Sequence, residues 1–98
     1  MEIIKNIQGN VCNIEVVGRL DTTTAPQLEA EFKNSLNNVT ELVLVFSKLE
    51  YISSAGLRVL LAAQKVMNAQ GSMKVTNVNS EIMEVFEITG FTDILTIA

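Results

Sequence analysis

The feature that most constrains the fold is an unbroken apolar run, Leu42 to Phe46, near the middle of the chain. The run is partly β-branched and too short for a helix, so it predicts a strand that is covered on both faces and central in its sheet. A helical pattern precedes it, with apolar residues spaced three or four positions apart at Leu28, Phe32, Leu36 and Val39, and Asn37-Asn38 at its end. The pattern therefore predicts strands alternating with amphipathic helices.

Two strands are predicted ahead of this region. They cover Glu2 to Ile7 and Val11 to Val17, and Gly9-Asn10 between them favours a tight hairpin turn in which the glycine supplies a positive φ. In the second strand every other residue, from Cys12 to Val16, is apolar, which is typical of a half-buried strand.

Polar and glycine residues mark the predicted helix ends. Thr24-Ala25-Pro26-Gln27 favours a helix start, because the Thr24 hydroxyl can accept from a free backbone N–H and proline is tolerated in the first turn. A long apolar helix follows the central strand, and we expect Gly71 to end it as a left-handed cap residue. Asn79 or Ser80 can cap a third helix, which Gly90 ends.

The remaining segments complete one α/β domain over residues 1–98. Ser72 to Val78 is predicted to be a strand, and the tail from Phe91 to Ile97 is expected to pack back as a short strand or a turn of helix. The order β-β-α-β-α-β-α predicts a mixed sheet of four to five strands with helices packed on one face.

Composition excludes several function classes. The net charge is −4 and the seven basic residues are scattered, which argues against nucleic acid as a partner. There is no histidine and no glycine-rich phosphate loop, so no metal, cofactor or catalytic activity is expected. The single Cys12 fits a buried apolar position. With no leader and no apolar run of membrane-spanning length, we expect a cytoplasmic protein without membrane insertion.

The segment "YISSAGLRVLL" joins a loop to the long helix, and its serines allow two interpretations. Either Ser53 or Ser54 can be the N-cap. Gly56 costs up to about 1 kcal/mol in a first helical turn, and close approach of another backbone is one candidate reason for it. A phosphate on Ser54 would be tolerated at a helix N-terminus and would add roughly −1.5 to −2 charges there.

This segment resembles the signature of STAS domains, the fold of bacterial anti-sigma factor antagonists. "GRLDTTTAPQLE" is similar to the family's Gly-x-Leu-Asp segment, and "FEITGFTDILTI" to its final helix and tail. The resemblance spans nearly all of the chain in the correct order, and it implies a mixed sheet with helices on one side.

The resemblance also implies a regulatory binding protein rather than an enzyme. Ser54 matches the family's phosphorylated serine. The implied partner is an anti-sigma factor that is also a serine kinase: binding releases sigma, phosphorylation ends binding, and a serine phosphatase resets the cycle. The implied partner-binding positions are Asp21, Thr22, Thr23, Ser53, Ser54, Ala55, Gly56 and Arg58.

Two positions depart from the family pattern. Ser53 replaces the usual aspartate, so Ser53 itself can be the phosphate acceptor, or the chain can be a STAS module that is not phosphorylated and serves a lipid-transport or stressosome-like complex. Arg58 replaces a glycine one helical turn after Ser54; it is either solvated or meets an acidic partner or a phosphate. Asp21 is either a loop residue that accepts from nearby backbone N–H groups or a partner contact.

Overall fold

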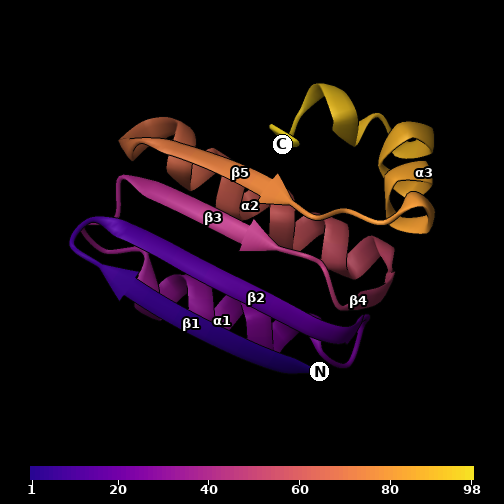
Figure 1. Ribbon diagram of the computed structural model, residues 1–98, viewed down its shortest axis with the longest axis horizontal. Helices are drawn as coiled ribbons and strands as arrows, with labels where there is room; N and C mark the ends of the chain where they lie inside the picture. The colour runs from indigo at the N-terminus through magenta and orange to yellow at the C-terminus, as the bar shows by residue number, and fades with distance from the viewer.

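The structure, a computed structural model, describes residues 1–98 and is an α/β domain (Figure 1). Its strands are β1 (Glu2–Gln8), β2 (Val11–Leu20), β3 (Glu41–Val45), β4 (Leu49–Ile52) and β5 (Ser72–Thr76). Its helices are α1 (Ala25–Ser35), α2 (Ser54–Gln70), α3 (Ser80–Thr89) and a short 3-10 turn, η1 (Phe91–Asp93). The predicted mixed sheet and three helices are confirmed.

The sheet is built around β2 and β3. Its order is β1-β2-β3-β5, with β1 antiparallel to β2 and the other pairs parallel. β3 therefore lies centrally, as the apolar run predicted. The fifth strand, β4, lies off this path and pairs with the last residues of β2 alone, where Gly18, Arg19 and Leu20 face Leu49, Tyr51 and Ile52.

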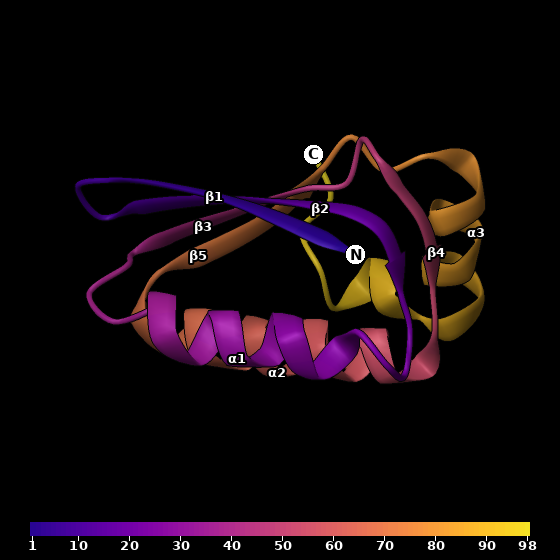
Figure 2. The same ribbon diagram turned by 90° about the horizontal axis from the view of Figure 1, so that it is seen from below.

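Helices α1 and α2 both lie under one face of the sheet, and the opposite face carries no helix (Figure 2). Leu42 and Leu44 of β3 are fully buried on the helix side. The prediction that β3 is covered on both faces is wrong. Val43, on the other face, is only 9% exposed, because the side chains beside it in register on β2 and β5 (Asn13 and Lys74) shield it.

Several residues predicted to form turns or to end helices do so in the structure. Gly9 has φ 61° in the β1–β2 hairpin, and Gly90 ends α3 in the left-handed region at φ 80°, both as predicted. Asn79, not Ser80, caps α3, because its Oδ1 accepts from the Ile82 N–H at 2.9 Å.

Gly71 is not the left-handed cap that the sequence predicted. Its φ of 173° is extended backbone, which any residue can adopt. The reason for a glycine is space, since a Cβ built there would lie 1.9 Å from the carbonyl oxygen of Thr40. That same oxygen accepts from the Ser72 N–H at 2.9 Å and links the starts of β3 and β5.

The tail takes both forms that the sequence allowed. η1 forms one turn of helix, and Ile97 then pairs with Val75 as a short parallel bridge. The Val75 N–H donates to Thr96 O at 2.8 Å, and the Ala98 N–H donates to Val75 O at 2.9 Å. The tail thus covers the outer edge of β5.

Four predicted strands have other limits in the structure, and one strand was not predicted. β1 runs one residue further, to Gln8, β2 runs on to Leu20, and β3 is Glu41–Val45 rather than Leu42 to Phe46. β5 stops at Thr76 because Asn77 adopts φ 59°, and β4 was expected to be loop. The four residues of β4 bury only Leu49 and Ile52, so they show no period-two alternation.

Lys5 ties the edge strand β1 to α1. Its ammonium lies 2.7 Å from Oε1 of Glu31 and donates to the Ser35 hydroxyl at 3.0 Å, and that hydroxyl donates to the same carboxylate at 3.0 Å. Hydrogen bonds from Lys5 and then Ser35 hold the pKa of Glu31 below its usual 4.5.

This carboxylate should make stability depend on pH. Because the folded pKa of Glu31 is lowered, its contribution is present above about pH 4.5 and is lost as the pH falls through the folded pKa. We expect Glu31→Gln to cost about 0.5–1 kcal/mol at pH 7, and the difference from the wild type to shrink as the pH falls through the folded pKa of Glu31. Urea unfolding at pH 7 and at a series of acidic pH values measures this. Glu84→Gln, at an exposed and unpaired glutamate, is the control, and an equal pH dependence in the two variants would contradict the assignment.

Candidate functional site

Parallel pairing of β2 with β4 brings two distant segments together. Leu20 and Ile52 are partners at the ends of these strands, and the Ser53 N–H donates to Leu20 O at 2.9 Å. The carboxyl ends of parallel strands meet at one edge of a sheet, so the loop that begins at Asp21 lies beside the start of α2. The segments that the resemblance assigned to one partner surface are therefore adjacent.

Asp21 holds the β2–α1 loop. Its Oδ1 accepts from the Thr23 hydroxyl at 2.7 Å, the Thr23 N–H at 3.0 Å and the Thr24 N–H at 3.2 Å. The hydrogen bond from the Thr23 hydroxyl is the main cause that lowers the pKa of the Asp21 carboxyl. The prediction that Asp21 accepts from nearby backbone N–H groups is confirmed, while its contact with a partner stays a prediction.

Thr24 occupies the N-cap position of α1 as predicted, but the prediction that its hydroxyl accepts from a free N–H of the helix is wrong. The Thr24 hydroxyl donates to Arg19 O at 2.8 Å and accepts from the Asp21 N–H at 2.8 Å, so it closes the loop behind the helix instead of capping it. The first helical N–H, that of Ala25, donates to Asp21 O at 2.8 Å. The helix start thus depends on Asp21 rather than on Thr24.

At the start of α2 the structure separates the two serines. Ser53 is the N-cap, with extended backbone, and its hydroxyl accepts from the Gly56 N–H at 3.4 Å. Ser54 is the first helical residue, is exposed, and its hydroxyl makes no hydrogen bond within the protein. Ser53 therefore takes the capping position of the family's aspartate, and the Ser54 hydroxyl is left accessible.

Gly56 allows the first turn of α2 to sit against the two strands. A Cβ there would lie 2.8 Å from Cγ of Leu20 and 2.9 Å from Cγ1 of Ile52. The expected close approach is confirmed, but the approaching groups are two side chains and not a backbone. This packing fixes Ser53 and Ser54 relative to the end of β2.

The other predicted positions surround this junction. Thr22 and Thr23 are exposed, and Ala55 is half-buried. Arg58 is exposed and forms no ion pair in the isolated chain, so it is solvated there. Because it lies four residues after Ser54 on the same helix, the two side chains share one face of α2.

Arg19 and Tyr51 belong to the same surface, although the sequence did not single them out. They are partners in the β2–β4 register, and the guanidinium carbon of Arg19 lies 4.2 Å from the centre of the Tyr51 ring. Tyr51 is 41% exposed. Only the pairing of β4 with β2 reveals this contact, and β4 was expected to be loop.

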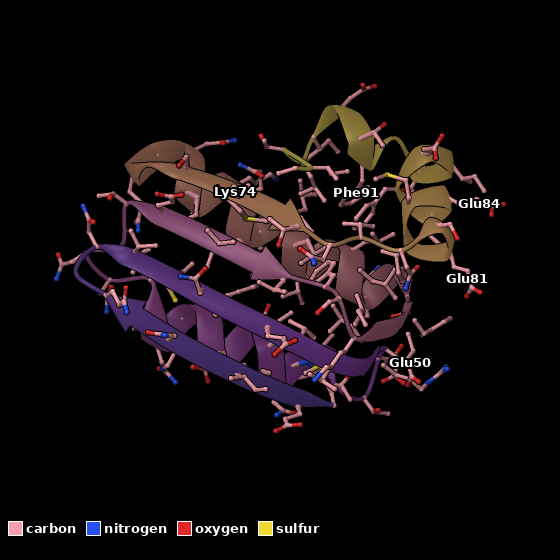
Figure 3. All side chains as sticks on the ribbon, in the orientation of Figure 1. Glu50, Lys74, Glu81, Glu84 and Phe91 are labelled. Carbon is pink, nitrogen blue, oxygen red and sulfur yellow. The ribbon has the colours of Figure 1, made fainter.

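Acidic side chains border the site on the side of α3. Glu50 of β4 and Glu81 and Glu84 of α3 project outward at the end of the molecule where these elements meet (Figure 3). α3 carries no basic residue. The charge of the surface is therefore positive at Arg19 of β2 and Arg58 of α2, and negative at the glutamates of α3.

The site is a surface rather than a pocket. One hollow of about 260 Å³ lies between α1 and α2, lined by residues such as Phe32 and Val59, and another lies beside Asn79. Neither includes Asp21, Ser53 or Ser54. No group of three potential metal ligands is found, and no helix is both long and apolar enough to span a membrane. This shape suits recognition of another protein.

Comparison with known proteins defines the class. The STAS domain family model matches residues 2–98, and the chain belongs to the STAS domain family. A proposed anti-sigma factor antagonist of Bordetella bronchiseptica, BtrV, is 40% identical over 83% of this chain and 72% of its own length. The anti-sigma-B factor antagonist of Bacillus subtilis is 28% identical over 91% of this chain and 83% of its own length.

Solved structures share the fold. The unphosphorylated anti-sigma factor antagonist SpoIIAA superposes with a TM-score of 0.85 at 20% identity, covering 99% of this chain and 88% of that one. An anti-sigma factor antagonist from Mycobacterium paratuberculosis gives a TM-score of 0.88 at 22% identity, covering 98% and 83%. SpoIIAA is also known in its phosphorylated form, with a TM-score of 0.77 to this chain.

Proposed function

We propose that this protein is an anti-sigma factor antagonist whose binding is switched off by phosphorylation of Ser54. In its unmodified form it binds an anti-sigma factor that is also a serine kinase, in the cytoplasm, and so releases a sigma factor. The kinase then phosphorylates Ser54, binding ends, and a serine phosphatase restores the free hydroxyl. The chain acts as a substrate and a binding partner, not as an enzyme.

The observation that carries the proposal is that the two serines at the start of α2 have different roles. Because Ser53 caps α2, the hydroxyl of Ser54 is exposed and unpaired, and a kinase can reach it without breaking the helix start. Ser53 itself is half-buried and its hydroxyl already accepts from the Gly56 N–H, so it is the poorer phosphate acceptor.

The surroundings of Ser54 suit a charge switch. The free N–H groups and the dipole at the start of α2 favour an added anion, so a phosphate there does not oppose the fold. The same anion would lie beside the Asp21 loop, on the surface that a partner must approach, where it adds roughly −1.5 to −2 charges. Arg58, one turn along, can partly neutralise it.

Intact-mass measurement tests the proposal. The protein is incubated with ATP and a kinase-type anti-sigma factor encoded near its gene, alongside Ser54→Ala and the matched control Ser53→Ala. We expect one phosphate on the wild type and on Ser53→Ala and none on Ser54→Ala, because of the two serines at this helix start only Ser54 has an exposed hydroxyl without a hydrogen bond in the protein.

Two results would overturn parts of this proposal. Phosphate on Ser54→Ala but not on Ser53→Ala would move the switch to Ser53. An unmodified wild type that stays tightly bound in the presence of ATP would instead make the chain a constitutive STAS module, of the kind that serves lipid-transport or stressosome-like assemblies.

A further inference from the structure

We propose that Arg19, held over the ring of Tyr51, is an anchor that receives a carboxylate of the anti-sigma factor. This inference rests on the proposed function and names the chemistry of the partner at the same surface. It concerns a residue outside the motifs that suggested the function.

The guanidinium of Arg19 is held in place but keeps its donors free. Stacking on Tyr51 restricts its orientation, with 4.2 Å between the guanidinium carbon and the ring centre. Its closest acid is Asp21, whose Oδ2 lies 3.8 Å from Nε, beyond hydrogen-bond distance. The side chain of Arg19 is 59% exposed and makes no hydrogen bond within the protein. A planar set of N–H donors therefore faces solvent.

Asp21 leaves the hydrogen-bond donors of the Arg19 guanidinium free. Its Oδ1 is engaged by the hydroxyl and N–H of Thr23 and by the N–H of Thr24, and its side chain is only 28% exposed. An approaching carboxylate can thus bind the guanidinium without displacing a native hydrogen bond. Two parallel N–H···O bonds are the geometry that arginine offers and lysine does not.

The position of the pair places it within the interface. Arg19 and Tyr51 come directly before Leu20 and Ile52, the partners from which the Asp21 loop and the start of α2 emerge. Exposed arginine and tyrosine side chains that are already ordered lose little conformational freedom on binding, and these residue types are enriched among the contacts that dominate interface energetics. Arg19 is the one basic residue of β2.

Binding kinetics of five proteins test the inference. Purified anti-sigma factor is titrated with wild type, Arg19→Lys, Tyr51→Leu, the double variant of these two substitutions and Lys65→Ala, after circular dichroism and thermal unfolding have shown that each is folded. Arg19→Lys keeps the charge but loses the planar donors, and we expect about tenfold weaker binding, mostly from faster dissociation. Tyr51→Leu should lose a similar factor, and the double variant little more, because the two side chains act together.

Lys65→Ala is the matched control, since Lys65 is an exposed cation further along α2, and its affinity should change less than about twofold. If wild type binds but Arg19→Lys binds equally well, or if Lys65→Ala is weakened as much, the anchor is refuted and the proposed function stands. If wild type does not bind any kinase-type anti-sigma factor, the proposed function fails first.

Discussion

Ser54→Asp is expected to weaken binding of the anti-sigma factor by about 100-fold, by placing a negative charge in a surface that the partner must desolvate. The same substitution should leave the domain as stable as the wild type or about 0.5 kcal/mol more stable, because an anion at a helix N-terminus is favourable. The two effects have opposite signs. Loss of binding therefore cannot be ascribed to loss of the fold.

Ser54→Asn separates charge from size. Asparagine has nearly the shape of aspartate but no charge, so its affinity should stay within about fivefold of the wild type. Isothermal titration calorimetry gives the affinities, and urea unfolding gives the stabilities. Equal losses in the two variants would show that the surface rejects a larger side chain rather than a charge, and a phosphate would then act by bulk.

Gly71→Ala is expected to destabilise the protein by about 3 kcal/mol, the largest effect among exposed positions. The added Cβ would lie 1.9 Å from Thr40 O. The Thr40 oxygen is a backbone atom that also accepts from the Ser72 N–H, and the Cβ is bonded directly to the backbone, so neither can yield without moving the start of β3 or β5. The backbone conformation itself is open to alanine, since φ is extended.

Gly9→Asn is the control for the steric clash expected in Gly71→Ala. Gly9 has a positive φ but nothing within 4 Å of its missing Cβ, and asparagine tolerates the left-handed region, so we expect a change within about 0.5 kcal/mol. Urea unfolding of both variants compares them. A Gly71→Ala protein as stable as the wild type would mean that the α2–β5 turn moves freely relative to β3.

The elements with a full repeat of apolar residues could be predicted from the sequence. The spacing of Leu28, Phe32 and Leu36 on α1, and the uninterrupted run of β3, follow from the burial of one helix face and of a central strand. The cap of α3 could be narrowed to Asn79 or Ser80, because a short polar side chain at a helix start can accept from a backbone N–H close by in sequence, and the structure selects Asn79. The prediction that β3 is covered on both faces failed. The sequence alone does not distinguish a residue that is shielded by side chains of neighbouring strands from one that is covered by a helix.

The geometry of the site could not be predicted in this way. β4 is four residues long and buries only its ends, so its pairing with β2 leaves no periodic signal. That pairing sets Arg19 against Tyr51 and brings Asp21 beside Ser53, through contacts between residues about thirty positions apart. The resemblance identified the two segments, but not the side chains that lie between them. Gly56 likewise indicated a close approach, but not which groups make it. Gly71 was predicted to be a left-handed cap, because the sequence does not reveal that the Thr40 carbonyl occupies the space where its Cβ would lie.

The pairing of β4 with β2 alone has a consequence for changing specificity. The four strands β1, β2, β3 and β5 form the continuous sheet on which α1 and α2 pack, while the residues proposed to bind the partner lie at the end of β2, in the loop after it, on β4 and at the start of α2. Residues 18–23 and 48–58 are joined to each other by their own short ladder, and within them Gly56 packs against Leu20 and Ile52. Leu49 and Leu57 of the same segments belong to the main core, and Leu49 O accepts from the Asn79 side chain. An exchange of these segments between domains of the family would therefore have to preserve the contacts of Leu49 and Leu57 with the core as well as the packing around Gly56.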